Sequence, residues 1–233
     1  MIGCLCIHGF TGAPYEVEPL VDFLEKRTDW VLRVPTLPGH GETLQLKGIS
    51  YKQWLVHAEN ELNWLLDKCE IVYIIGFSMG GLIASYLATK YPIHKLVLLS
   101  AAAYYINFKQ LAVDIKEMFK DTIKGNLSSN ELFLRYKKKI TATPIGATVQ
   151  FRKLVTEVRP ILSEVKTPTF IAQGESDGIV PMKSAQYLYE HIGANRKEIL
   201  YIPDSKHHIC HCNQNELLFE NILSFLNEKI HEG

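Results

Sequence analysis

The sequence lacks an excess of charge of either sign, and it also lacks a long apolar run. Its 233 residues include 25 Lys and Arg against 25 Asp and Glu, so the formal net charge is zero. A balanced chain gives no electrostatic indication of nucleic acid or another polyanionic partner. Its apolar runs are far shorter than the roughly 18 residues of a membrane-spanning helix, so we expect no stable membrane insertion. The length suits one domain with a sizeable core.

Cysteine is scarce, and its count is odd. The five residues are Cys4, Cys6, Cys69, Cys210 and Cys212. An odd count in a chain of this size argues against a disulfide framework. The apolar N-terminus, residues 1–7, has no basic flank and continues directly into His8, so it predicts a strand and not a signal peptide. Both observations favour a cytoplasmic location.

Short apolar runs alternate with longer amphipathic segments along the chain. The predicted strands are Gly3–Ile7, Val31–Val34, Ile71–Ile75, Leu96–Ser100, Thr169–Ala172 and Glu198–Ile202. Helical periodicity covers Tyr15–Lys26, Tyr51–Leu66, Gly80–Lys90, Lys183–Ile192 and Glu216–Lys229. This alternation predicts an α/β fold with about six mainly parallel strands and helices on both faces. Functional residues in such a sheet follow the carboxyl ends of the strands.

One stretch breaks the alternation, and we interpret it as a helical cap, with helical patterns over Tyr105–Lys124, Ser129–Lys139 and Gly146–Leu162. Residues 103–168 contain no convincing strand, so they are predicted to be inserted into a core of residues 1–102 and 169–233. The cap carries a net charge of about +6, which suits either a solvated helix face or attraction to an anionic lipid or substrate. Its apolar side chains either line an acyl slot or pack against the core. They are Tyr104, Tyr105, Ile106, Phe108, Leu111, Met118, Phe119, Phe133 and Phe151.

A serine flanked by glycines follows the third predicted strand, in the sequence Gly76-Phe77-Ser78-Met79-Gly80. It matches the Gly-x-Ser-x-Gly pattern in the strand–turn–helix setting that this pattern requires. The two glycines remove Cβ atoms that would clash at so sharp a turn. The pattern predicts Ser78 as a nucleophile, which needs a base and oxyanion donors; the alternative is a glycine-rich turn with a passive serine.

The oxyanion donors are expected on two loops. The segment from His8 to Gly12 follows the first strand, and the backbone N–H of Phe10 is the first predicted donor. The N–H of Met79, the residue after the nucleophile, is the second. We expect His8 to brace the loop, and a further loop with His40 to shape the pocket.

The catalytic acid and base are expected after two later strands, in that order. Asp177 lies on a tight loop, where a short carboxylate can accept an imidazole N–H and fix the tautomer; Glu175 is the fallback. Two adjacent histidines, His207 and His208, follow the last strand, and neighbouring side chains in an irregular loop usually diverge. Asp204 is a rival acid, but a partner from another strand is favoured because Asp204 shares the histidine loop.

The run from His207 to Cys212 also suggests zinc, whose usual ligands are His and Cys. So dense a run cannot surround one ion tetrahedrally without strain, and a spaced second pair of ligands is missing. We therefore predict no metal site.

With these residues in place, the chain resembles the α/β-hydrolase superfamily, and within it bacterial carboxylesterases and monoacylglycerol lipases. The resemblance is carried by His8-Gly9-Phe10-Thr11-Gly12, Gly39-His40-Gly41, Gly76-Phe77-Ser78-Met79-Gly80-Gly81, the loop from Gly174 to Pro181, and Ser205-Lys206-His207. Those esterases commonly carry Ser-Gly-His followed by an apolar residue. Aligning that motif favours His207 as the base and leaves His208 at the surface or against the cap. Lys206 and His208 depart from the motif.

The resemblance implies an α/β-hydrolase fold with a triad of Ser78, Asp177 and His207, oxyanion N–H groups from Phe10 and Met79, and no metal or organic cofactor. The implied reaction is hydrolysis of small-molecule carboxylic esters, either short to medium acyl esters or monoacylglycerols, through an acyl-enzyme. A C–C bond hydrolase or another triad hydrolase shares the same residues. A non-catalytic receptor for small ligands is the alternative from another class. The oligomeric state is left open.

Overall fold

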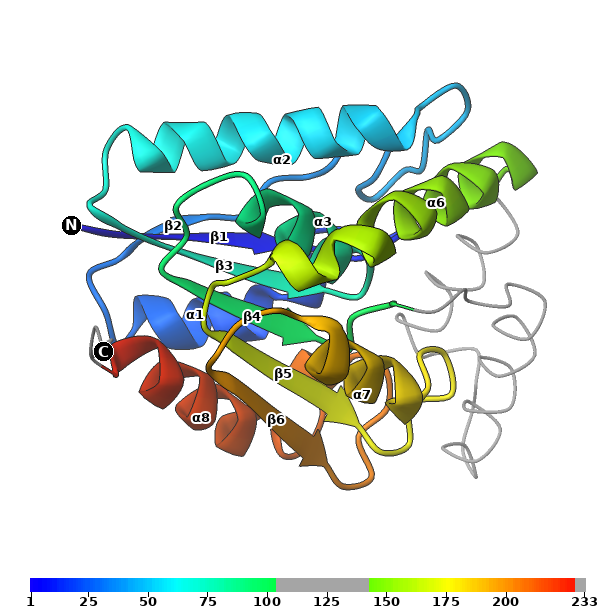
Figure 1. The fold of residues 1–233 in the computed structure, drawn as a ribbon. Helices are drawn as coiled ribbons and strands as arrows, with labels where there is room; N and C mark the ends of the chain where they lie inside the picture. Colours follow the sequence, from blue (N-terminus) through cyan, green and yellow to red (C-terminus); the bar gives the residue numbers. More distant parts are fainter. Residues whose placement is uncertain (104–142, 229–233) are drawn as a thin grey trace.

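Six strands form one sheet in which every neighbouring pair is parallel (Figure 1). They are β1 (Ile2–Ile7), β2 (Val31–Arg33), β3 (Ile71–Phe77), β4 (Lys95–Leu99), β5 (Thr169–Gly174) and β6 (Lys197–Ile202). The computed structural model describes residues 1–103 and 143–228. The predicted α/β fold class is confirmed, and each strand lies within a few residues of its predicted range.

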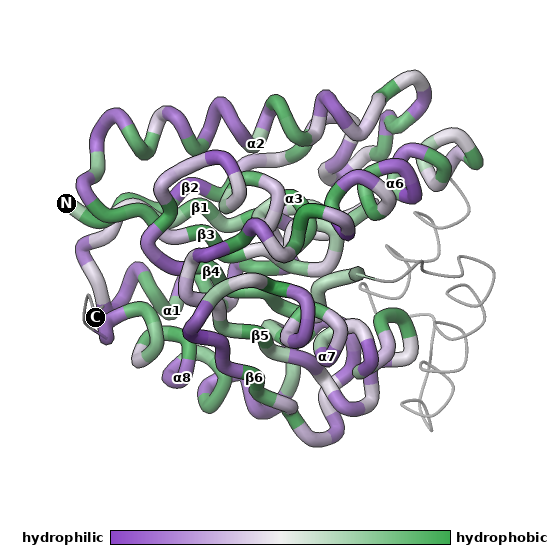
Figure 2. The backbone as a smooth tube through the Cα atoms, in the orientation of Figure 1, coloured by the Kyte–Doolittle hydropathy of each residue, from purple (hydrophilic) through white to green (hydrophobic). Residues whose placement is uncertain are grey.

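Helices cover both faces of the sheet. One face carries α2 (Tyr51–Leu66), α3 (Met79–Ala88), α6 (Ile145–Val158) and α7 (Met182–His191), and the other carries α1 (Glu18–Glu25) and α8 (Asn215–Asn227). Leu5 and Ile7 of β1 enter the core under the first group, whereas Cys4 and Cys6 enter the core under the second. Because the pleat points successive side chains to opposite faces, a strand covered on both sides is apolar throughout. Figure 2 shows this as hydrophobic strands between helices with hydrophilic outer faces.

The strand order places the functional loops at one edge. The order across the sheet is β2-β1-β3-β4-β5-β6, so the direction of winding reverses between β1 and β3. Ligand sites in open parallel sheets lie beyond the carboxyl ends of the strands at such a reversal. The loop after β1 and the turn after β3 therefore meet at the place where this fold favours a site.

One predicted helix is shorter than expected. The pattern over Tyr15–Lys26 forms a short 3-10 turn, η1 (Pro14–Glu16), followed by α1, which starts only at Glu18. Pro19 has no N–H to donate, so it fits the first turn of a helix and not the interior of a longer one. The break places Glu16 in the turn η1, outside α1.

The described part of the predicted cap is helical. The expected helix over Gly146–Leu162 consists of α6 followed by the 3-10 turn η3 (Arg159–Glu164), which contains a proline in its first turn. Two hydrogen bonds tie α6 to the start of α2: the Tyr51 hydroxyl donates to Glu157 at 2.5 Å, and the Tyr51 N–H donates to Gln150 at 3.3 Å. The predicted helices over 105–124 and 129–139, and all the candidate lining residues except Phe151, lie outside the described residues.

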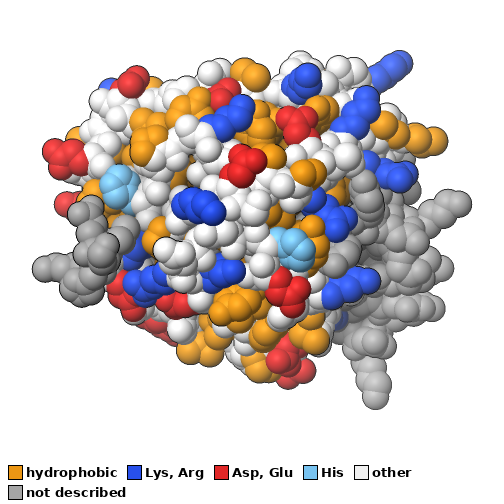
Figure 3. All heavy atoms as spheres, viewed as in Figure 1, with side chains coloured by type: hydrophobic (Ala, Val, Ile, Leu, Met, Phe, Trp, Pro, Cys, Tyr) orange, Lys and Arg blue, Asp and Glu red, His pale blue; other side chains and the backbone are white. Residues whose placement is uncertain are grey.

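The surface of the described residues carries both charges. Figure 3 shows basic and acidic side chains interspersed across one face, as the zero net charge leads one to expect. Within residues 1–103 and 143–228, no helix is both long enough and apolar enough to cross a bilayer.

Candidate active site

Ser78 sits on a strained turn between β3 and α3. Its backbone has φ 53° and ψ −114°, a region that non-glycine residues rarely adopt. A Cβ atom at Gly76 would lie 2.3 Å from the carbonyl oxygen of Gly80, and one at Gly80 would lie 2.2 Å from the carbonyl oxygen of Ile7. The turn is therefore possible only with glycine at both positions, and it leaves Ser78 at the sheet edge beside the end of β1.

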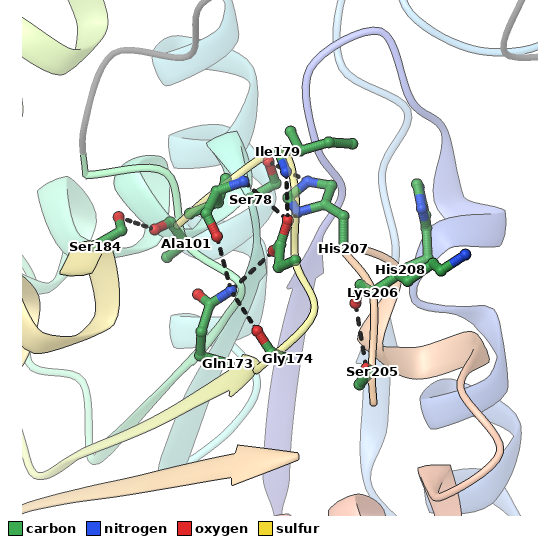
Figure 4. Close-up of polar contacts among 12 residues, drawn as sticks. Ser78, Ala101, Gln173, Gly174, Ile179, Ser184, Ser205, Lys206, His207 and His208 are labelled. Carbon is green, nitrogen blue, oxygen red and sulfur yellow. Dashed lines mark hydrogen bonds and ion pairs between the residues drawn. The ribbon is translucent and has the colours of Figure 1, made fainter. Parts of the chain in front are cut away.

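Three side chains from distant parts of the chain form a continuous hydrogen-bond relay (Figure 4). His207 Nε2 lies 3.1 Å from Ser78 Oγ, and His207 Nδ1 lies 2.8 Å from Asp177 Oδ2. Ser78, Asp177 and His207 are 4%, 8% and 5% exposed, so the relay is shielded from solvent. The structure thus brings together the three side chains that the sequence singled out as nucleophile, acid and base.

Asp177 is held as an ionised acceptor by its own loop. Its Oδ1 accepts the N–H groups of Ile179 and Val180 at 2.9 and 2.8 Å. Burial, the largest single influence, raises the pKa of Asp177, but the charge and hydrogen bond of His207 and the two backbone donors together lower it below its usual value. The carboxylate is therefore charged wherever an imidazolium would form beside it.

Gln173, which the sequence analysis did not identify, donates a hydrogen bond to the carboxylate of Asp177. Its Nε2 donates to Asp177 Oδ2 at 2.8 Å and to the carbonyl of Val180 at 3.0 Å (Figure 4). The residue is fully buried near the end of β5. A polar amide in an otherwise apolar buried strand is the pattern that points to it, because buried polar groups need partners.

The loop after β1 lies against the nucleophile. A Cβ atom at Gly9 would lie 3.1 Å from the Cβ of Ser78, so the backbone there runs directly beside the reacting residue. His8 braces this loop as expected: its Nε2 accepts the N–H of Leu37 at 3.0 Å, which leaves Nδ1 to donate to the carbonyl of Gly9 at 2.8 Å. The backbone that leads into Phe10 is thereby held beside Ser78.

Aromatic side chains surround the ring of Phe10. The ring stacks on Phe151 of α6 at a centroid distance of 5.3 Å and meets Trp54 of α2 edge to face at 5.8 Å. His40 lies against both Phe10 and Trp54, at 6.0 and 5.4 Å. His40 therefore belongs to the aromatic cluster beside the loop.

The rival acids are placed elsewhere. Glu175 is exposed, and so is Asp204, which occupies a turn with φ 56°. His208, which the resemblance left at the surface or against the cap, is partly buried beside the loop after β1. Its side chain is 23% exposed, and its Nε2 faces Glu16 Oε1 at 3.4 Å across the loop after β1. The direction of this side chain is set by packing beside Phe77, at a centroid distance of 5.4 Å, which the sequence does not reveal.

The histidine and cysteine run after β6 disperses its side chains. His207 faces Ser78, His208 faces Glu16, and His211 Nε2 donates to the carbonyl of Tyr15 at 2.8 Å. Within the described ranges, no three His, Cys, Asp or Glu side chains converge as they would around a metal ion.

The sheet, the strained serine and the buried relay define a serine hydrolase with the α/β-hydrolase fold. More narrowly, the chain belongs to the family described as serine aminopeptidase, S33, which it matches over residues 4–213.

Individual relatives share this architecture along most of their length. The chain is 27% identical to a thermostable monoacylglycerol lipase of Bacillus sp. (strain H-257), over 88% of this chain and 82% of that protein. It is 23% identical to a carboxylesterase of Bacillus subtilis (strain 168), over 95% and 91%. Among solved structures, one of the metagenome-derived lipolytic enzymes LipS and LipT superimposes with a TM-score of 0.79 at 24% identity, over 98% and 94%.

Proposed function

We propose that this protein hydrolyses carboxylic esters through an acyl-enzyme on Ser78. The observation that carries the proposal is the relay from Ser78 Oγ through His207 to Asp177, with links of 3.1 and 2.8 Å. A serine hydroxyl is a weak nucleophile unless a positioned base takes its proton, and this geometry supplies that base.

The reaction follows from the positions of these groups. Ser78 Oγ attacks the ester carbonyl while His207 Nε2 takes its proton, and Asp177 stabilises the resulting imidazolium. His207 then gives the proton to the leaving alcohol, and an acyl group stays on Ser78. Water, deprotonated by the same histidine, attacks the acyl-enzyme and releases the carboxylic acid. No cofactor takes part in these steps.

The oxyanion is assigned to the backbone N–H groups of Phe10 and Met79. Two features support the assignment: the loop of Phe10 lies against Ser78, and Met79 is the first residue of α3. A helix N-terminus presents unpaired N–H groups and a positive dipole end, which favour developing negative charge. Loss of one such donor typically lowers the rate about 10²- to 10³-fold.

The proposed substrates are short to medium acyl esters or monoacylglycerols. The names of the two Bacillus relatives, a monoacylglycerol lipase and a carboxylesterase, support this class. The ring of Phe151 in α6 stacks on Phe10 in the loop after β1, and both Phe151 and Trp54 are fully buried in the core. Because Phe151 comes from α6, we also assign residues 103–168 as a cap over the site. All five cysteines are free thiols, which supports a cytoplasmic location.

Labelling and turnover together test the proposal. A fluorophosphonate probe should label the wild-type protein and should not label Ser78→Ala. Nitrophenyl esters with acyl chains of graded length should be hydrolysed in burst kinetics, whereas aminoacyl anilides and C–C cleavage substrates should turn over far more slowly. Preferential cleavage of an anilide or of a carbon–carbon bond would replace the ester assignment. A folded wild-type protein that the probe never labels would favour a non-catalytic receptor.

A further inference from the structure

A second buried carboxylate lies inside the loop after β1. Glu16 belongs to the turn η1, is 2% exposed, and accepts the N–H of Gly9 on its Oε2 at 2.8 Å. A Cβ atom at Gly12 would lie only 1.9 Å from this oxygen, so the carboxylate fills the space that the loop encloses. The backbone on either side of Phe10 is therefore wrapped around Glu16.

The partner of Glu16 across the site is the residue next to the proposed base. His208 Nε2 lies 3.4 Å from Glu16 Oε1, and its ring stands nearly perpendicular to that of His207, with centroids 5.5 Å apart. Both rings lie against Phe77, the residue before the nucleophile, at 4.9 and 5.4 Å. The contact between Glu16 and His208 thus joins two loops beside the serine turn. One is the loop after β1 that contains residues 8–12 (the oxyanion loop), and the other is the loop after β6 that carries His207 and His208 (the histidine loop).

Neighbouring hydrogen bonds extend the same junction. His211, at the end of the turn η4 (Ile209–His211), donates from Nε2 to the carbonyl of Tyr15 at 2.8 Å. The N–H of His211 in turn donates to the carbonyl of His208 at 2.8 Å. The turns η1 and η4 are therefore joined by two contacts. Glu16 faces His208, and the carbonyl of Tyr15 accepts from His211.

Burial of this pair needs a reason beyond packing. Placing a carboxylate in a protein interior is unfavourable unless charge partners and hydrogen bonds compensate it, and an apolar side chain would fill the same space without that cost. Burial is the largest influence on the pKa of Glu16 and raises it, but His208, His8 and the Gly9 N–H together lower it to about 2. A charged and directional anchor fixes the loop in one position, which an apolar contact does less strictly.

We infer that Glu16 and His208 are positioning residues, which lock the oxyanion loop onto the loop that carries His207. The inference rests on the proposed function, because it concerns how the N–H of Phe10 is held relative to Ser78 and His207. Preorganised donors stabilise a transition state only when they stay aligned, and a displacement of about 1 Å can lower a rate about 10²-fold. The pair acts through Gly9 and through the backbone of His207, and it does not touch the substrate.

The test compares substrate binding with transition-state binding in four variants. Glu16→Ala and His208→Ala should each lower kcat about 10- to 100-fold and leave KM within about threefold. The double variant should lose little more than either single one, because both residues serve one contact. His208→Gln, which retains a donor near the position of Nε2, should recover most of the rate. The affinity for a boronic acid that mimics the tetrahedral adduct should fall in parallel with kcat.

Controls separate positioning from general destabilisation. Glu18→Gln and His191→Gln change exposed residues of the same types outside the site and should leave kcat unchanged. Active-site titration with a fluorophosphonate normalises every rate to folded, reactive Ser78, so partial unfolding does not imitate a loss of kcat.

Each outcome decides the inference. Independent, multiplicative losses in the double variant would overturn it, as would a rise in KM at unchanged kcat or boronic-acid affinity that does not follow kcat. An active wild type with unaffected variants would remove this inference alone. A wild type that neither labels nor hydrolyses esters would instead remove the proposed function.

Discussion

Two histidines stand side by side after β6, and each faces a buried carboxylate, yet the two pairs differ in length, support and neighbours. His207 lies 2.8 Å from Asp177, whose oxygens also accept two backbone N–H groups and the amide of Gln173. His208 lies 3.4 Å from Glu16, which accepts the backbone N–H of Gly9. The ring of His207 continues to Ser78, whereas the ring of His208 faces the loop after β1. Both pairs therefore join an imidazole to a carboxylate, and the direction in which each imidazole points decides its role.

The loop after β6 therefore serves two tasks. The two consecutive rings both lie against Phe77 and stand at 84° to each other, so that one faces Ser78 and the other faces Glu16. The tighter pair suits a group that must carry charge during a reaction, and the looser pair suits a group that holds a loop. Substitutions in each pair test this division.

Removing the first pair's histidine should have the largest effect. We expect His207→Ala, like Ser78→Ala, to lower kcat by about 10⁶-fold, because a serine without a base is not activated. His208→Ala should lose at least a thousandfold less. Steady-state hydrolysis of a nitrophenyl ester measures both, with circular dichroism to show that the variants fold. Equal losses for the two histidines would refute the division.

Replacing Asp177, the carboxylate that faces His207, should have the second-largest effect on the rate. Asp177→Asn should lower kcat/KM by about 10⁴-fold, because an amide no longer stabilises the imidazolium and favours the wrong tautomer of His207. Labelling by a fluorophosphonate should slow in parallel. A loss of the same size in Glu16→Gln would mean that the second carboxylate acts in the reaction itself.

The second carboxylate should be visible in the pH dependence of stability. The pKa of Glu16 is lowered to about 2, below the 4.5 of a free glutamate, so its charge stabilises the fold fully above pH 4.5. This contribution is lost as the pH falls toward 2. Wild type should therefore be more stable than Glu16→Gln at pH 6, and the difference should shrink as the pH is lowered. Urea unfolding at stepped pH measures it; a constant difference would contradict the assignment.

Gln173 should have the smallest effect of the four. Gln173→Met keeps an apolar chain of similar length but removes the donor to Asp177, and a hydrogen bond to a charged group contributes about 1.5–3 kcal/mol. We expect kcat to fall about tenfold and the pH profile of kcat/KM to change. The reason is that Asp177 would keep its contacts with His207 and the two backbone N–H groups but lose the amide of Gln173. An unchanged pH profile with lowered thermal stability would assign Gln173 to packing only.

The fold was largely predictable because its cues are local. The strands are short apolar runs, and burial on both faces explains why Leu5 and Cys6, which point to opposite sides, are both apolar. Errors arose where proline acts: Pro19 delays α1, and the expected helix that ends at Leu162 continues only as a 3-10 turn after Val158. These breaks are encoded in the chain, but periodicity alone hides them.

The candidate site was predictable in its outline. Ser78 and Asp177 were found from loops that follow strands, and His207 was favoured over His208 by the resemblance; the structure brings the three within hydrogen-bonding distance. Glu16 and Gln173 were missed because each is one polar residue within an apolar segment, and neither matches a motif. Their importance comes only from what lies opposite them in space.

The serine turn is encoded locally, since five consecutive residues contain both the strain and the glycines that permit it. Which histidine faces Ser78 and which faces Glu16 depends instead on tertiary packing. Side-chain directions in an irregular loop follow from what packs around them, here Phe77 and the turn η1. Those neighbours are more than 100 residues away along the chain, and folding alone brings them to the loop.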